Sequence, residues 1–251
     1  MDADTLGELD PKFLLPLLKM IPVYLEDIYR EVVGDDLAEK FKKGIIEYGR
    51  EIYEKYRTTL QEAHKKLPEQ HARRLDKLLQ EINNSYKNES TSSDPCSWMN
   101  IFKSIPVYYL MYSITNSIIR HTREDQIKKI PNILEYLSKP EVYKALLTTH
   151  ILKSTIVIEK YKGQLSYDDL EQIKHLKESN DTQKYMEAMQ NYIQKVIESI
   201  SSAFQDASSY IENIIDGFFY MNEKYFDKKI ELTLLSVLIE SKLGDKSSKY
   251  S

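Results

Sequence analysis

The stretch of sequence that decides the fold is residues 186–218, MEAMQNYIQKVIESISSAFQDASSYIENIIDGF. Its apolar residues recur at alternating steps of three and four, at Met189, Ile193, Val196, Ile200, Ala203, Ala207, Tyr210 and Ile214. Four more apolar residues widen this stripe, namely Ile197, Phe204, Ile211 and Phe218. Side chains at such steps lie on one face of an α-helix, so the stretch predicts one long helix with a near-heptad face.

The length of this apolar face also predicts an oligomer interface, because the stripe is longer than one short neighbouring helix can cover. The small side chains of Ala203 and Ala207 would let a partner helix approach closely, from the same chain or from a second copy. We therefore predict self-association through eight residues of the stripe: Ile193, Val196, Ile200, Ala203, Phe204, Ala207, Ile211 and Ile214.

The composition of the whole chain favours helices. Its 251 residues are 41% hydrophobic and 29% charged, and they include only 7 Gly and 8 Pro. Strand-rich folds consume more of these turn residues, so the composition favours an all-α multi-helix bundle. The formal net charge of −4 gives no overall attraction to nucleic acids or anionic membranes. The single cysteine, Cys96, excludes an intramolecular disulfide and fits a cytoplasmic protein.

Apolar periodicity, capping residues and prolines predict further helices outside the long stretch. We expect them at about residues 13–33, 35–67, 68–86, 98–120, 131–139, 140–163, 166–179 and 225–243. The first of these is no membrane span, because Pro16, Lys19 and Pro22 interrupt it. The hexapeptides at 19–24 and 103–108 share five of six residues, which is either a trace of duplication or a chance likeness of two proline-containing helices.

One polar stretch divides the predicted helices. Residues 83–97, NNSYKNESTSSDPCS, are rich in Asn, Ser and Thr, which is typical of a linker or loop. This division predicts an N-terminal helical hairpin region at 1–85, a linker at 86–97 and a C-terminal helical bundle at 98–251. The alternative is one continuous domain.

The sequence contains no motif of the familiar enzyme classes. It lacks a glycine-rich phosphate loop, a nucleophile elbow, a kinase signature and a Cys-x-x-Cys pair. His150 has apolar sequence neighbours, and a pocket between helices could form near it and near Tyr108, Tyr109, Met111 and Tyr112. Nothing close to His150 in the sequence supplies a nucleophile, which favours a packing role. We therefore predict no catalytic residue, no metal ion and no cofactor.

Two basic clusters offer a different function, in which folding brings them together to contact nucleic-acid phosphates. The candidate phosphate-binding residues of the first cluster are Lys65, Lys66, Arg73 and Arg74, and those of the second cluster are Arg120, Arg123, Lys128 and Lys129. Most cations of the first cluster have an opposite charge within one helical turn, which is typical of an ordinary solvated face. Tyr48, Tyr53 and Tyr56 could stack on bases, but their helical spacing favours packing between helices.

These observations leave three hypotheses of different classes. The leading one is a non-enzymatic helical scaffold or protein-interaction protein that self-associates or binds a protein partner. The first alternative is a nucleic-acid-associated protein of replication, defence or a virus. The second is an enzyme or apolar-ligand protein with its pocket near His150. The frequent Tyr, Ile, Lys and Glu residues are typical of proteins from thermophiles and their viruses.

Overall fold

The computed structural model describes the chain in several segments, and every structural statement below concerns these residues. They are residue 30 and residues 34–87, 97–162, 167–179, 181–221 and 225–247. Nearly all of the expected helix at 13–33, including the first hexapeptide copy, lies outside them. Most of the polar linker, residues 88–96, lies outside them as well.

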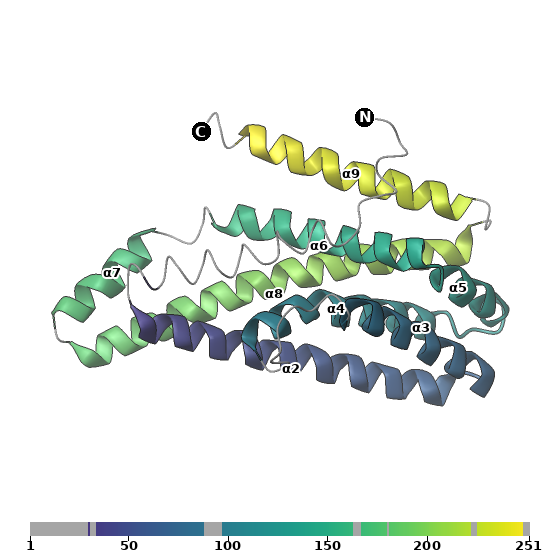
Figure 1. Ribbon diagram of the computed structural model, residues 1–251, viewed down its shortest axis with the longest axis horizontal. Helices are drawn as coiled ribbons and strands as arrows, with labels where there is room; N and C mark the ends of the chain where they lie inside the picture. The colour runs from purple at the N-terminus through teal and green to yellow at the C-terminus, as the bar shows by residue number, and fades with distance from the viewer. Residues whose placement is uncertain are drawn as a thin grey trace.

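The described residues form eight α-helices and one 3₁₀-helix and contain no strand, which confirms the prediction of an all-α multi-helix bundle (Figure 1). The elements are α2 (Asp35–Lys66), α3 (Glu69–Lys87), α4 (Trp98–Arg120), η2 (Ile127–Lys129), α5 (Ile130–Leu137), α6 (Pro140–Lys162), α7 (Tyr167–Glu178), α8 (Thr182–Tyr220) and α9 (Phe226–Ser247). The long helix predicted from the near-heptad stripe is α8, which has 39 residues.

The central helix of the bundle is α8. It packs against α2, α4, α6 and α7, while α9 packs on α6 at the edge of the molecule (Figure 1). Contacts from Ser113 to Ser208 and from Arg120 to Asp216 show that α4 and α8 run in the same direction. The helix α6 runs the opposite way, from the end of the bundle near α5 back towards α7 (Figure 1).

The apolar stripe of α8 is buried inside the chain itself. The eight side chains predicted as an oligomer interface are at most 9% exposed: Ile193, Val196, Ile200, Ala203, Phe204, Ala207, Ile211 and Ile214. Three long helices of the same chain, α2, α4 and α6, lie against α8. Several neighbours within one chain therefore explain the length of the stripe.

The helix α2 lies close to α4 and α8 because two glycines face those helices. A Cβ atom at Gly49 would lie 2.3 Å from Cγ2 of Ile101, and one at Gly44 would lie 2.1 Å from Cδ1 of Ile197. Carbon atoms in contact lie about 3.5 to 4 Å apart, so a side chain at either glycine would force its neighbour to move. At Gly44 the nearest atom is the flexible end of the Ile197 side chain, whereas at Gly49 it is a methyl group on Cβ of Ile101, so Gly49 is the glycine that permits the close approach of α2 and α4.

The helix α4 is apolar on most sides, as expected for a helix surrounded by others. It begins after Ser97, whose side chain accepts a hydrogen bond from the backbone N–H of Asn100 at 3.3 Å. It continues through Pro106, which is buried inside the helix and has no N–H to donate to the preceding turn. The helices α2, α3, α6 and α8 all contact it.

The buried side chains on either side of the polar linker belong to one hydrophobic cluster. Leu37 and Phe41 of α2 precede the linker, while Phe204 of α8 and Val237 of α9 follow it, and all four are members of this cluster. The described parts of the regions 1–85 and 98–251 therefore share a core.

Replacing Gly49 with Val should destabilise the fold by about 1–3 kcal/mol, because the added methyl groups overpack the contact between α2 and α4. Chemical denaturation of both chains measures the loss. Adding Ile101→Ala to this variant should recover part of the stability, because it removes the methyl group nearest to the new side chain. Equal stability of the wild-type chain and the Gly49→Val variant would contradict the close approach.

Candidate functional site

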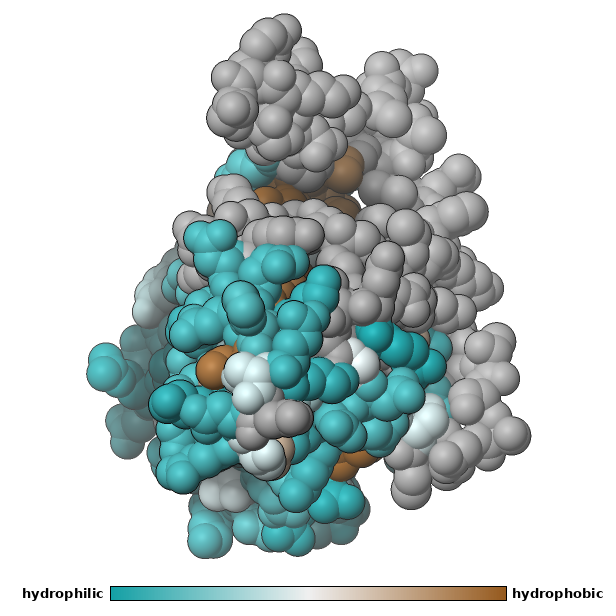
Figure 2. Space-filling model, turned by 90° about the vertical axis from the view of Figure 1, so that its left-hand side faces the viewer, coloured by the Kyte–Doolittle hydropathy of each residue, from teal (hydrophilic) through white to brown (hydrophobic). Residues whose placement is uncertain are grey.

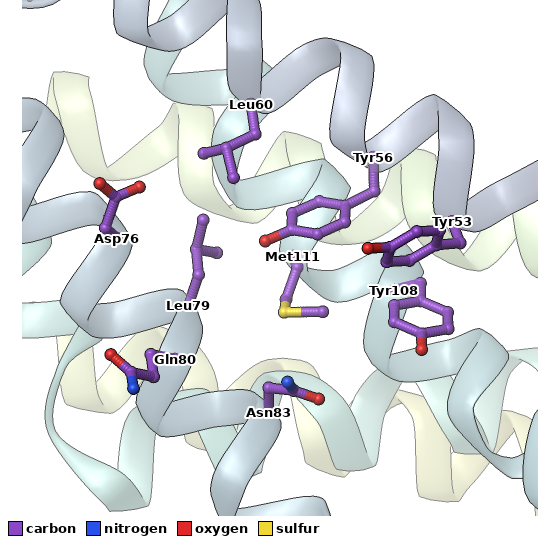
Figure 3. A pocket seen from close by; sticks show the side chains of 9 residues that line it. All are labelled: Tyr53, Tyr56, Leu60, Asp76, Leu79, Gln80, Asn83, Tyr108 and Met111. Carbon is purple, nitrogen blue, oxygen red and sulfur yellow. The ribbon is translucent and has the colours of Figure 1, made fainter. Parts of the chain in front are cut away.

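A pocket of about 450 Å³ lies between α2, α3 and α4 (Figure 3). Its lining residues are Tyr53, Tyr56, Leu60, Asp76, Leu79, Gln80, Asn83, Tyr108 and Met111. The space arises because α3 turns back after Pro68 and touches α2 at few places, while α2 and α4 pack along their length. The volume falls within the range of small-molecule sites in proteins.

Three tyrosine rings form one wall of the pocket, and we call Tyr53, Tyr56 and Tyr108 the tyrosine cluster. Tyr53 meets Tyr108 edge to face with ring centroids 5.3 Å apart, and Tyr56 stacks on Tyr108 at 6.4 Å. Such pairs stabilise one another beyond the area that they bury. The rings therefore hold each other in place, although Tyr53 remains 43% exposed.

Polar side chains of α3 form the other wall of the pocket, and Asp76 is the charged residue among them (Figure 3). Oδ1 of Asp76 lies 2.9 Å from Nε2 of His64, near the end of α2. Burial, and to a lesser degree the Asp76 carboxylate, raises the pKa of Tyr56 to about 12. The Tyr56 hydroxyl therefore stays protonated at neutral pH, and it points towards the middle of the pocket (Figure 3).

His150 lies elsewhere, in the centre of the bundle. It is fully buried, and its ring stacks on Tyr109 at 5.6 Å and on Phe204 at 6.1 Å. Its Nδ1 lies 3.4 Å from Oγ of Ser154, one turn along α6. Burial lowers the pKa of His150 to about 3, and the backbone carbonyl of Phe204 offsets this only in part. The imidazole is therefore neutral at physiological pH, and no solvent reaches it.

The structure separates the residues that were predicted to share a pocket with His150. Tyr108 and Met111 line the pocket between α2, α3 and α4. Tyr109 faces another side of α4, where its hydroxyl lies 2.7 Å from that of Tyr48 and its ring contacts His150. Neighbouring residues of a helix point in different directions, so residues that are adjacent in the sequence lie at two separate sites. The fourth residue predicted to lie near His150 is Tyr112, whose ring faces the ammonium group of Lys55.

The two basic clusters lie at the same end of the bundle, where α2 meets α3 and where α4 leads to η2 (Figure 1). Half of the eight candidate phosphate-binding residues are engaged within the chain. Lys66 pairs with Glu62, Arg73 with Glu69, Arg120 with Glu212 and Asp216, and Lys129 with the carbonyl of Phe219. Within the described residues no ion pair involves the other four, which are Lys65, Arg74, Arg123 and Lys128.

Arg120 joins the end of α4 to the end of α8. Its guanidinium lies 2.6 Å from Oε2 of Glu212 and 2.8 Å from Oδ2 of Asp216. The adjacent His121 lies 3.2 Å from the second oxygen of Asp216 and stacks on Phe219 at 3.8 Å. Two carboxylates thus offset the charge of Arg120, so its role in this structure is to position two helices.

Exposed apolar side chains gather at a different place, around the turn from α8 to α9 and along α9. Six of the eight large hydrophobic side chains that are exposed in the described residues lie there: Tyr220, Met221, Tyr225, Leu232, Leu235 and Ile239. By contrast, the coloured surface at the end of the bundle where α8 begins is mainly hydrophilic (Figure 2).

These exposed residues of α9 have a periodicity of their own. Leu232, Leu235 and Ile239 follow steps of three and four, and Lys228 in α9 and Tyr225 just before it continue these steps. These residues of α9 therefore lie on one side of the helix, which we call the outer face of α9. The apolar stripe of α8, from which the oligomer interface was predicted, gives no information about this face. The signal in the sequence is a second apolar stripe, opposite the buried residues Phe226, Ile230 and Val237.

Two kinds of site are absent from the described residues. No group of three or more His, Cys, Asp or Glu side chains there is placed to hold a metal ion. No helix in the described ranges has both the length and the apolar character needed to cross a membrane.

Comparisons with known proteins give no relative: no family model matches the chain, and no curated protein or solved structure is significantly similar to it.

Replacing His150 with Phe should weaken the dependence of stability on pH in acid. In the unfolded chain His150 binds a proton near its ordinary pKa of 6.5, whereas in the folded chain it does so only near pH 3. The wild-type fold therefore loses up to about 1.4 kcal/mol of stability for each pH unit between these values as the pH falls. Phe keeps the ring contacts and cannot be protonated.

Denaturation of both chains at neutral and at mildly acid pH measures this difference. Carboxylates titrate in both chains, so the difference between them isolates His150. Wild-type and variant chains with the same pH dependence would show that the imidazole is not sealed from solvent.

Proposed function

We propose that the protein is a non-enzymatic helical interaction protein that self-associates, and that the outer face of α9 is its contact surface. The observation that carries this proposal is the exposure of large aliphatic side chains along that face. Leu232 is 58%, Leu235 41% and Ile239 49% exposed. Clustered exposed apolar side chains mark interaction sites on protein surfaces. His150, the one candidate catalytic base, has no access to a substrate.

The need for a further partner follows from the two apolar sides of α9. Its inner side, with Phe226, Ile230 and Val237, is buried and packs on α6. A surface helix of a globular protein has one apolar stripe, and a helix with two such stripes needs neighbours on both sides. The described helices cover only the inner side.

The outer face of α9 is suited to pack against the same face of a second copy. Apolar residues at steps of three and four are those of helices that pair side by side. A twofold dimer places the same patch of both copies in contact, so the stripe around Leu235 meets itself, apolar against apolar. Lys228 is the charged residue within the stripe, and a lone polar residue in such a seam fixes the register at some cost in affinity.

Replacing Leu232, Leu235 and Ile239 together with Ser should weaken self-association by more than about 100-fold, because each position loses a buried aliphatic side chain on both copies. Light scattering over a range of concentrations measures the mass of each chain. The Met186→Ser variant is the matched control, because Met186 is also exposed, at 43%, but lies at the start of α8. A monomeric wild-type chain, or a triple variant with the wild-type mass, would refute the proposed contact.

A second candidate function is the binding of nucleic-acid phosphates. The observation that favours it is the position of both basic clusters at one end of the bundle (Figure 1). Four of its cations, Lys65, Arg74, Arg123 and Lys128, have no ion-pair partner within the described residues. Internal pairs offset the charge of Lys66, Arg73 and Arg120, which makes this function the weaker candidate.

Replacing Lys65, Arg74, Arg123 and Lys128 with Gln tests this second candidate. If these residues contact phosphates, a mobility shift of DNA or RNA by the wild-type chain should weaken with salt, and the variant should bind more weakly with a smaller salt dependence. Changing Lys43 and Lys184, two exposed cations at the other end of the bundle, is the control. Absence of any shift at low salt would rule this candidate out.

A further inference from the structure

The pocket between α2, α3 and α4 has a lining whose charge selects among ligands. Asp76 is a lining residue, and none of the described side chains that line the pocket belongs to lysine, arginine or histidine. The hydrogen bond to His64 uses Oδ1 of Asp76, so the second carboxylate oxygen lies outside that bond. A phosphate or carboxylate ligand would therefore meet the negative charge of Asp76, and no cation among the described lining side chains would offset that charge.

The tyrosine cluster is a second, independent feature that favours a positive charge. The face of an aromatic ring carries partial negative charge and attracts an ammonium group that lies within about 6 Å of the ring centre. Tyr56 lies at the edge of this cluster, with its hydroxyl pointing towards the middle of the pocket, and the charge of Asp76 acts on that hydroxyl (Figure 3). The region between Asp76 and Tyr56 is therefore the part of the pocket best suited to a cation.

The rest of the pocket is suited to an apolar group. Leu60 of α2 and Leu79 of α3 project into the pocket, and the thioether of Met111 lies near the middle of the view (Figure 3). A methionine side chain is flexible and polarisable, so it adapts to an aromatic or branched group. The partly exposed ring of Tyr53 lies at the side of the pocket where solvent has access.

We propose that this pocket binds an amphipathic organic cation, an amine with an aromatic or branched apolar body. The ammonium group lies between Asp76 and the ring of Tyr56, and the apolar body lies against Leu79, Met111 and Tyr108. The pocket shares no residue with the outer face of α9. Binding of the cation and self-association are therefore tested separately.

Three probes of similar size and different charge test the proposal: phenethylammonium, phenethyl alcohol and hydrocinnamate. The readout is the NMR signal of the Met111 methyl group in protein with labelled methionine methyl groups, assigned with a Met111→Leu variant. Phenethylammonium should shift this signal in a saturable manner and bind about tenfold more tightly than the alcohol. Hydrocinnamate should leave the signal unchanged at the same concentrations.

The Asp76→Asn variant should lose the preference for the cation while it binds the alcohol as the wild-type chain does. Glu81→Gln is the matched control, because it removes one carboxylate from α3 outside the pocket lining. Thermal unfolding of both variants checks that the fold is intact. Equal affinity for all three probes, no saturable shift with any of them, or equal effects of the two variants would overturn the proposal.

Discussion

The burial of one face of α8 is the constraint on which the rest of the structure depends. A helix of 39 residues with an apolar stripe along most of its length cannot be covered by a single helix of ordinary size. The chain meets this demand with α2, α4 and α6, which lie along α8. The glycines of α2, the length of α4 and the antiparallel course of α6 all help these helices to cover the apolar face of α8.

Two hydroxyl pairs within this core join neighbouring helices, which restricts how these helices can slide. The hydroxyl of Tyr48 on α2 lies 2.7 Å from that of Tyr109 on α4, and Ser113 of α4 is hydrogen bonded to Ser208 of α8. Breaking such a pair leaves a buried polar group without a partner, and this costs more than the bond itself contributes. The apolar stripes therefore bring the helices together, and the hydroxyl pairs select one register among several that are similarly apolar.

The helices were predictable because their signals are local. Periodicity and prolines placed every described α-helix. The helix α8 begins after Asp181, whose side chain accepts a hydrogen bond from the N–H of Lys184 at 3.3 Å. The sites were not predictable in the same way, because they depend on how helices distant in the sequence meet. Tyr56 and Asp76 are 20 positions apart and face one pocket. The stripe of α8 has the same pattern whether its neighbours come from one chain or two.

The attachment of α9 differs from that of the other long helices. It packs on α6 along one side, with one polar contact at its first turn, from Tyr136 to Asp227, and another further along the helix, from Lys153 to Glu240. We expect a helix held in this way to open with a smaller free energy than the whole molecule, so that its amides exchange with solvent through local opening while those of α4 and α8 await global unfolding. An edge helix that opens alone and is apolar on two sides can also dock on the α6 of another copy. The same geometry thus provides a route to domain swapping, in which two chains exchange α9.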